Sequence, residues 1–370
     1  MTHTKDSAGL HETRPQEGML PHATGWIEGA FNSSGLSDCC LIVPTYKRAA
    51  DVTSLLIHLV DCEQRFPGSV PAEIVVVDGS PDRATEEAVA SLTRDDLPFL
   101  LKYVRTRPGL TRQRNLGIDS SSGNFVFFLD DDAIPAPDYF RIVRQIFTDD
   151  ASKSIGAVGA CVTNEWDQPV SFRWRVRLRL GIVPRIPPMM YAACGTSTPR
   201  AMLKYFSGIR EVDILSGCAF NFRREVFETD RFSDFFTGYS QGEDMEMSLR
   251  VGRRWKVVCA GDARVIHCQS QGGRPMSFAK GRMEIRNRLF IWRRYSMSRA
   301  TLLDKIRLFT DFAFLAVLDA GGFVRRPWKA GPILHGAGVL FGIVESVCRP
   351  PEFDEPVPRT YQVEFRLRAS

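Results

Sequence analysis

Residues 124–135 read NFVFFLDDDAIP, and this stretch determines how the rest of the sequence is interpreted. The apolar run at 125–129 predicts a buried strand, and three adjacent aspartates at 130–132 follow it. Their mutual repulsion must be relieved by solvent, by protonation or by a cation. Open α/β sheets hold ligands at the carboxyl ends of their strands, and Mg²⁺ takes carboxylate and phosphate oxygens. The pattern therefore favours a metal–diphosphate site, and the alternative at this point is a solvated acidic turn.

Similar apolar runs recur along the chain and predict a sheet. Further strands are expected at 39–43, 73–78, 100–104 and 155–162, with helical patterns between them. Continuous β-branched runs are typical of strands that are buried on both faces. Strands that alternate with helices are typical of a parallel sheet covered by helices. We therefore predict an α/β fold.

Polar turns follow the predicted strands. PTYKR at 44–48 and DGSPD at 78–82 are expected along the same sheet edge as the aspartates. Asp78 is placed to accept hydrogen bonds from a base or ribose, and its alternative role is an Asx turn. Arg112 and Arg114 on the next predicted helix offer charge to a diphosphate, or are only solvated. Neither GxGxxG after the first strand nor GxxxxGK[ST] occurs, so a dinucleotide or P-loop site is not supported.

The second half of the chain contains two informative patterns. Residues 172–181, FRWRVRLRLG, alternate apolar and arginine side chains, which predicts a strand or a basic interfacial face. In SQGEDMEMSLR at 240–250, Ser240 and Glu243 have the spacing of a capping box, so a helix should begin here. This gives Glu243 a structural role. It leaves Asp244 with none except complementing the helix dipole.

Six segments, in this order, resemble the inverting family 2 glycosyltransferases of the GT-A fold: PTYKR, VVVDGSPD, RQRNLGI before GNFVFFLDDD, LSGCAFNFRREVF, GEDMEMSLR and DARVIH. They lie within residues 39–270. The resemblance implies a mixed, mostly parallel sheet flanked by helices. It also implies inverting transfer of a sugar from a nucleotide-diphosphate sugar to an acceptor hydroxyl, with Mg²⁺ or Mn²⁺ as cofactor. The solvated-turn interpretation of the aspartates is correspondingly weaker.

The resemblance also implies roles for individual residues. The donor would be bound at the nucleotide by Pro44, Thr45, Arg48 and Asp78, near the diphosphate by Arg112 and Arg114, at the ribose or metal water by Asp130 or Asp131, and near the sugar by Gly217 and Cys218. The metal ligands would be Asp130, Asp132 and His267, although the register within the aspartate triplet is ambiguous. Asp244, with Glu243 beside it, matches the carboxylate pair that supplies the general base. Lys47 departs from the family, which commonly has Asn there.

Composition sets the remaining limits. The chain has 370 residues, 44% of them hydrophobic and 25% charged, and a net charge of +5, which is ordinary for a globular protein. Nine cysteines without a CxxC pair or zinc spacing predict reduced thiols in the cytosol. The first residues lack a signal-peptide pattern, and no uninterrupted apolar run is long enough to span a membrane.

Residues 271–300 contain eight Lys or Arg and one Glu, with apolar side chains at helical spacing: Phe278, Ile285, Leu289 and Trp292. A basic amphipathic helix with Trp predicts contact with an anionic membrane surface. The alternative is a helix packed on the catalytic domain with a solvated basic face. The apolar segments at 308–324 and 331–347 favour the first reading.

We therefore expect a poorly ordered segment at 1–36, a GT-A domain at 37–270, a C-terminal helical appendage of basic and apolar character at 271–349, and a tail at 350–370. The donor would be a UDP-, GDP- or dTDP-sugar. The acceptor would be a saccharide or a lipid-linked saccharide, used in the cytoplasm at the inner face of the membrane for polysaccharide or glycolipid synthesis. No nucleic-acid module is recognised. A sugar-phosphate nucleotidyltransferase and a non-catalytic nucleotide-binding membrane-associated protein remain as alternatives.

Overall fold

The computed structural model describes residues 23–28, 35–92, 97–270, 277–325, 328, 330–351 and 361–367. Four of the predicted strands form a parallel core, in the order β4-β3-β2-β5 across the sheet. The first two polar turns begin at the ends of β2 and β3, and the aspartates follow β5. Their bounds are β2 Leu36–Thr45, β3 Pro71–Asp78, β4 Leu100–Arg105 and β5 Phe125–Leu129. β5 is buried along its whole length, as a strand covered on both faces should be.

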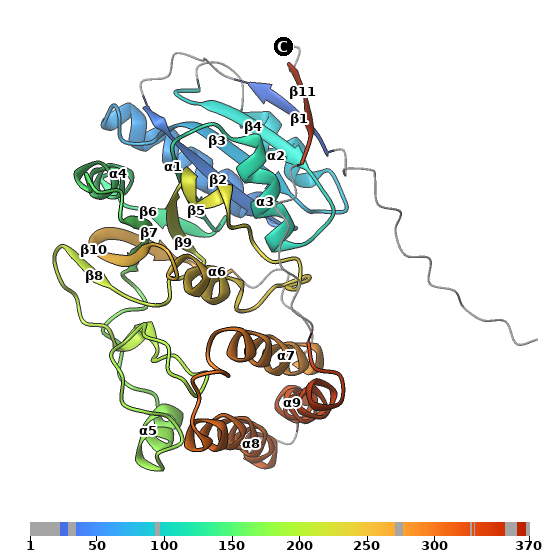
Figure 1. Ribbon diagram of the computed structural model, residues 1–370. Helices are drawn as coiled ribbons and strands as arrows, with labels where there is room; N and C mark the ends of the chain where they lie inside the picture. Colours follow the sequence, from blue (N-terminus) through green and yellow to red (C-terminus); the bar gives the residue numbers. More distant parts are fainter. Residues whose placement is uncertain are drawn as a thin grey trace, which may run out of the picture.

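Three helices connect these strands: α1 (Ala49–Arg65), α2 (Ala84–Leu92) and α3 (Leu110–Ser120). α1 packs against α2, and α3 contacts β2 and β3. The crossover from β4 to β5 runs back across the sheet. Right-handed crossovers therefore put α3 on the face opposite α1 and α2. The predicted α/β fold, a mixed sheet flanked by helices, is confirmed (Figure 1).

Beyond β5 the sheet has strands of both directions. β9 (Ala219–Arg223) lies antiparallel between β5 and β7 (Ile155–Val162), and β10 (Lys256–His267) runs parallel to β7. The short strands β6 (Ala133–Pro135) and β8 (Ile209–Glu211) pair antiparallel with β10. In the β10–β6 pair, His267 lies opposite Ala133. This register brings the end of β10 beside the aspartate triplet.

The opposite edge of the sheet joins the two ends of the chain. β1 (Ala23–Glu28) pairs antiparallel with β4, and β11 (Val363–Leu367) pairs parallel with β1. The prediction that residues 1–36 are poorly ordered is therefore wrong for β1, where Trp26 stacks on Tyr103 with ring centroids 5.3 Å apart. Residues 1–22 and 29–34 lie outside the described residues. The strands that pair with β1 are distant in the sequence, so no local sequence pattern predicted β1.

Two local predictions are corrected in the second half of the chain. The strand alternative for residues 172–181 is wrong, because α5 (Phe172–Arg179) is a helix that buries Trp174 and is capped by Ser171. The capping box is also wrong. α6 (Glu243–Val251) begins after Gly242, whose φ of 94° is left-handed, and Ser240 Oγ instead donates to the carbonyls of Phe236 and Gly238.

The C-terminal helices α7 (Ser277–Tyr295), α8 (Leu302–Arg325) and α9 (Ala330–Cys348) pack together away from the sheet, with α5 beside α8 (Figure 1). α7 lies between the sheet region and the other two helices. Five of its apolar residues are buried, in two clusters: Ile285, Leu289 and Trp292 with Leu308, Phe312 and Val339, and Phe290 and Ile291 with Tyr191 and Phe236. Of the predicted apolar face, Ile285, Leu289 and Trp292 are thus buried in protein, whereas Phe278 is 37% exposed. Arg274, which belongs to the same predicted pattern, lies outside the described residues.

Candidate active site

The predicted polar turns meet at one edge of the sheet. Thr45 ends β2, Asp78 ends β3, and the aspartate triplet follows β5. Gln113 of α3 ties the first two together, because its Nε2 donates to the carbonyl oxygens of Thr45 and Val77 at 2.8 Å each. Gln113 was not singled out from the sequence, although it lies in the RQRNLGI segment.

Asp131 is buried and bound by side chains at the end of β2 and in the turn that follows it. It is 3% exposed, and its carboxylate accepts from Thr45 Oγ1 at 2.7 Å and from Arg48 Nη1 at 3.0 Å. Burial raises its pKa to about 7, against the effect of these two hydrogen bonds. Thr45 and Arg48, which the resemblance placed in the nucleotide pocket, therefore also hold the triplet in position.

Asp130, Asp132 and His267 form the one group of three or more acidic, His or Cys ligand atoms that lie together in the described part of the chain. Their ligand atoms are within 4.8 Å of one another. Asp132 Oδ2 accepts from the Ser270 N–H at 2.7 Å, whereas its buried Oδ1 has no hydrogen-bond partner and lies 3.4 Å from His267 Nε2. Two carboxylates and one imidazole suit a hard or borderline divalent cation. The unpartnered buried oxygen is a ligand position, so the residues present fit such a metal.

His267 is held by a second carboxylate. Its Nδ1 lies 2.8 Å from Glu165 Oε1, which leaves Nε2 facing Asp132. Histidine ligands of metals commonly donate their other ring N–H to a carboxylate in this way. Burial lowers the pKa of His267, but the nearby carboxylates of Asp132 and Glu165 outweigh burial and raise it to about 9. Without a metal, the protonated ring therefore supplies the positive charge that the two aspartates need.

Glu165 and Arg200 were missed by sequence reasoning. Arg200 Nε donates to Glu165 Oε2 at 2.6 Å, and burial raises the pKa of Glu165 while His267 and Arg200 together lower it to about 2. Neither residue belongs to a recognisable motif. The only local signal is a stretch without acidic residues at 168–210: Glu165 lies just before it and Arg200 lies within it.

A second acidic pair lies at the start of α6. Glu243 is buried and accepts from Arg114 Nη1 at 2.7 Å. Burial and the neighbouring Asp244 charge raise the pKa of Glu243 to about 8, against the effect of Arg114. Asp244 is more open, and its two oxygens accept from the N–H groups of Gly217 at 2.9 Å and Met245 at 2.8 Å.

Arg114 connects the two acidic groups. It is 1% exposed, and besides Glu243 it donates to the Gly217 carbonyl at 3.0 Å and lies 3.5 Å from Asp130 Oδ1. The Asp130 N–H in turn donates to the Cys218 carbonyl at 3.0 Å. The predicted Asp130, Gly217, Cys218, Glu243 and Asp244 are thus brought together. The solvated alternative for Arg114 is wrong.

The remaining predicted residues occupy the same edge. Asp78 is fully buried, and its oxygens accept from Ser80 N at 2.7 Å, which is the Asx turn, and from Tyr103 Oη at 2.6 Å. Pro44 is buried near the end of β2, and Arg112 is half-buried with no hydrogen bond to a described residue. Lys47 has a φ of 56°, a conformation that favours Asn, which explains the family preference that this chain lacks.

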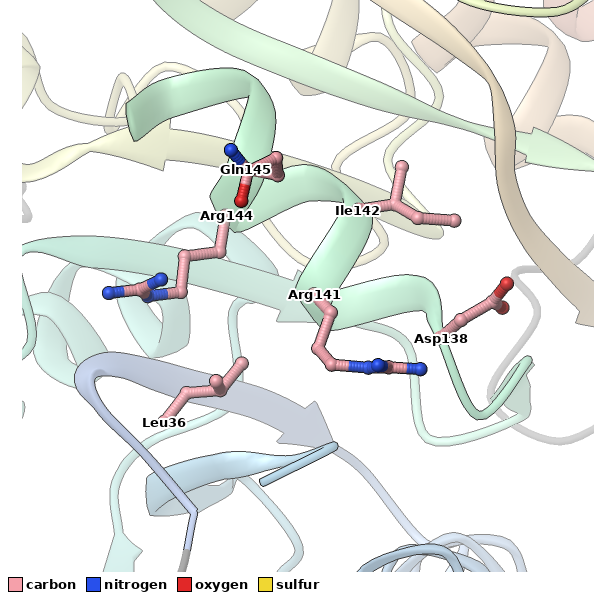
Figure 2. Close-up of a pocket in the computed structure, with 6 residues that line it drawn as sticks. All are labelled: Leu36, Asp138, Arg141, Ile142, Arg144 and Gln145. Atoms are coloured by element: carbon pink, nitrogen blue, oxygen red, sulfur yellow. The ribbon is translucent and has the colours of Figure 1, made fainter. Parts of the chain in front are cut away.

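A separate hollow lies at the other end of β2. A pocket of about 460 Å³ is lined by Leu36, Asp138, Arg141, Ile142, Arg144 and Gln145 (Figure 2). Leu36 begins β2 and the other residues lie on or beside α4 (Tyr139–Asp149). It is at the amino end of the strand, away from Thr45, and takes no part in the site.

Comparisons with known proteins agree with this arrangement. The family model described as "Glycosyl transferase family 2" matches residues 40–230. Among solved structures, mannosyltransferase PcManGT from Pyrobaculum calidifontis, in complex with GDP-Man and Mn²⁺, is 18% identical at a TM-score of 0.52, over 86% of this chain and 90% of that one. GalNAc-T7, with UDP, GalNAc and Mn²⁺, is 16% identical at a TM-score of 0.51, over 81% and 54%. At these identities the likeness shows the fold alone. A search of curated proteins found no match.

Proposed function

The chain belongs to glycosyl transferase family 2, and we propose that it transfers a sugar from a nucleotide-diphosphate sugar to an acceptor hydroxyl with inversion, assisted by a divalent cation. The observation that carries this proposal is the cluster of Asp130, Asp132 and His267 at the carboxyl edge of the sheet, with the buried Asp132 Oδ1 unpartnered. The Mn²⁺ bound by the two fold relatives supports the choice of metal.

We assign different roles in donor binding to different residues of the site. Asp130, Asp132 and His267 would hold the cation, which when bound offsets the negative charge that grows on the departing diphosphate. Arg48 and Thr45 fix Asp131 and so keep the triplet in one orientation. Asp78 is fully buried and held by Ser80 and Tyr103, and we assign it to fixing the turn that borders the base or ribose. Arg114 is already bound to Glu243, so we assign contact with the diphosphate to Arg112, near the start of α3.

Asp244 is the better general base of the two α6 carboxylates. Inversion requires a base that takes the proton of the acceptor hydroxyl on the face opposite the leaving group. Glu243 is buried against Arg114, whereas Asp244 is accessible and oriented by the Gly217 N–H. We therefore assign the proton transfer to Asp244 and a positioning role to Glu243 and Arg114.

We propose the same division of the chain that the sequence indicates, a catalytic domain at 37–270 and a helical region at 271–349, with β1 and β11 added to the sheet edge from outside the first range. The acceptor we propose is a saccharide or lipid-linked saccharide in polysaccharide or glycolipid synthesis, used in the cytoplasm at the membrane. The large loop region at 163–210, which has no acidic residue after Asp167, borders the site through Arg200 and Glu165 and supports a role in acceptor binding.

Nucleotide release tests this proposal. With Mn²⁺ or Mg²⁺ present, the protein should slowly hydrolyse one donor from a panel of UDP-, GDP- and dTDP-sugars. EDTA and Asp132→Ala should each remove at least about 90% of the rate, because both empty the metal site. Asp149→Ala, an exposed aspartate at the end of α4, is the matched control and should leave the rate unchanged.

Three outcomes contradict the proposal in different ways. Release that persists in EDTA would remove the metal from the reaction. Failure to bind or hydrolyse every donor would favour a non-catalytic protein. Pyrophosphate release from a nucleoside triphosphate and a sugar phosphate would identify a nucleotidyltransferase.

Glu165→Ala should weaken Mn²⁺ binding by about 10- to 100-fold, because His267 then loses the carboxylate that orients its ring and raises its basicity. Calorimetric titration of the protein with Mn²⁺ measures this directly, without substrate. Glu211→Ala, at a 70% exposed side chain on β8, is the control and should bind Mn²⁺ normally. Equal affinities for the two variants would show that Glu165 does not support a metal ligand.

A further inference from the structure

The acidic side chains of helices α8 and α9 have partners within the protein, and those of Asp311 and Asp319 are buried. The four acidic residues of these two helices are all engaged: Asp304 with Thr301 at the start of α8, Asp311 with Arg177 and Arg288, Asp319 with His335, and Glu345 with Arg282. Asp311 is 1% exposed. In a helix at the surface of a water-soluble protein, charged residues face the solvent and the apolar stripe faces the core. Here the buried side holds the carboxylates of Asp311 and Asp319.

The opposite faces of the two helices are apolar. On α8, exposed residues follow one side of the helix: Leu302, Ile306, Phe309 and Val317. On α9 the exposed large apolar residues are Ile333, Leu334, Leu340, Phe341, Val344 and Val347. Trp328, between the helices, is 76% exposed. Exposed apolar residues gathered along a helix in this way are typical of a binding surface. α9 is also, among the described residues, the one helix long and apolar enough to cross a membrane, with a mean hydropathy of 1.4.

α5 adds a basic border to this apolar surface. It is attached to α8 by the Arg177–Asp311 ion pair at 2.9 Å and by Arg307 Nε, which donates to the Gly181 carbonyl at 3.0 Å. Its outer side exposes Phe172 and three arginines: Arg173, Arg175 and Arg179. Because the acidic groups of α8 and α9 are engaged, little negative charge opposes these arginines. Figure 1 shows α5, α8 and α9 together at the end of the molecule away from the sheet.

We propose that this α5–α8–α9 face docks on an anionic lipid bilayer, with α8 and α9 lying in the membrane plane. The exposed apolar side chains and Trp328 would contact the acyl chains, and the arginines of α5 would contact the anionic headgroups. A second copy of the chain fits less well, because its own arginine border would meet this one. The inference does not depend on the proposed sugar transfer. Within residues 271–349, the region expected at the membrane surface, it places the contact on α8 and α9 instead of the basic helix α7, and it adds α5 from outside that region.

The packing of α9 favours docking over crossing. Gly338 and Gly342 of α9 lie against the α7 backbone at Phe278 and Arg282, and Gly281 of α7 lies against α9 at His335. A Cβ at these positions would collide with the facing chain. α9 is therefore held along α7, and α7 is held against the catalytic domain by Phe290. A helix fixed in this way presents one face to the bilayer while its other face stays on protein.

Vesicle co-sedimentation of the full chain tests the proposal. The protein should sediment with vesicles of phosphatidylcholine and phosphatidylglycerol and much less with phosphatidylcholine alone. Ile306→Glu and Leu340→Glu should each lower binding by about tenfold or more, because each removes an apolar contact and adds a negative charge. Ile57→Glu on α1 is the matched control, since Ile57 and Ile306 are both 53% exposed, and it should bind as the unmodified protein does.

The basic border is tested separately by Arg175→Glu combined with Arg179→Glu, which should remove the preference for anionic vesicles. Circular dichroism melting should show all variants folded, because the altered side chains are exposed. Donor hydrolysis should be unchanged in Ile306→Glu, so a failed membrane test stays distinct from a failed reaction. Absence of vesicle binding, or equal losses in Ile57→Glu and Ile306→Glu, would overturn the proposal. A dimer in light scattering that Ile306→Glu converts to a monomer would assign the face to a second copy and likewise overturn it.

Discussion

Asp244→Asn should lower turnover by about 10²- to 10⁴-fold while donor affinity stays unchanged. The amide keeps the shape of the side chain and can still accept from the Gly217 N–H, but it cannot take the proton of the acceptor hydroxyl. The change therefore affects the transition state and not the bound donor. The measurement is the rate of nucleotide release from the donor that the panel identifies, with donor affinity determined by calorimetry.

Glu243→Gln is the natural comparison, because the two carboxylates are adjacent and only Glu243 accepts a hydrogen bond from a charged side chain. It should cost stability, since Arg114 then loses its charged partner, and should keep turnover within about tenfold of the unmodified enzyme. The reverse result, with turnover lost in Glu243→Gln and kept in Asp244→Asn, would transfer the role of the base to Glu243. Full turnover in both variants would place the base elsewhere.

The centre of the site could be predicted because its residues are carried by strand ends. Thr45, Asp78 and Asp130 each follow an apolar run, and parallel strands bring their carboxyl ends to one edge whatever the details of packing. His267 belonged to a segment recognised by resemblance. Glu165 and Gln113 could not be found in this way. Each acts through a partner far away in the sequence, and glutamate or glutamine alone carries no signal for that.

The fold shows the same limit. β5 and β3 are continuous apolar runs, and a short run of this kind is typical of a strand buried on both faces of the sheet. β1 pairs with strands from elsewhere in the chain, so its local composition predicted disorder. α5 alternates arginine with apolar residues as a strand would, yet Trp174 is its one buried side chain, and a single anchor suits a helix as well. At α6, Glu243 reaches Arg114 instead of the helix cap, because a buried arginine requires a carboxylate.

Arg114→Ala should lower the free energy of unfolding by about 3–5 kcal/mol, the typical cost of removing one partner of a buried ion pair. The side chain is 1% exposed, bonds Glu243 and the Gly217 carbonyl, and lies over the ring of Phe220 at 4.8 Å. Its loss leaves a buried carboxylate and a buried carbonyl without a donor. Urea denaturation at pH 7, followed by circular dichroism, measures the change.

The same variant should show a pH dependence that the unmodified protein shows less strongly. The pKa of Glu243 is already raised from its ordinary 4.5 to about 8 by burial and Asp244, and Arg114 is the group that opposes this rise. Without Arg114, Glu243 keeps its proton in the folded state, whereas in the unfolded chain it loses the proton above pH 4.5. The free energy of unfolding therefore falls as the pH rises, by up to about 1.4 kcal/mol per pH unit. The unmodified protein loses stability in the same way up to its own Glu243 pKa of about 8, so the deficit should be smaller at pH 7 than at pH 9. Adding Glu243→Gln should remove this dependence and restore part of the stability. An equal deficit at both pH values would mean that Glu243 is not the group left uncompensated.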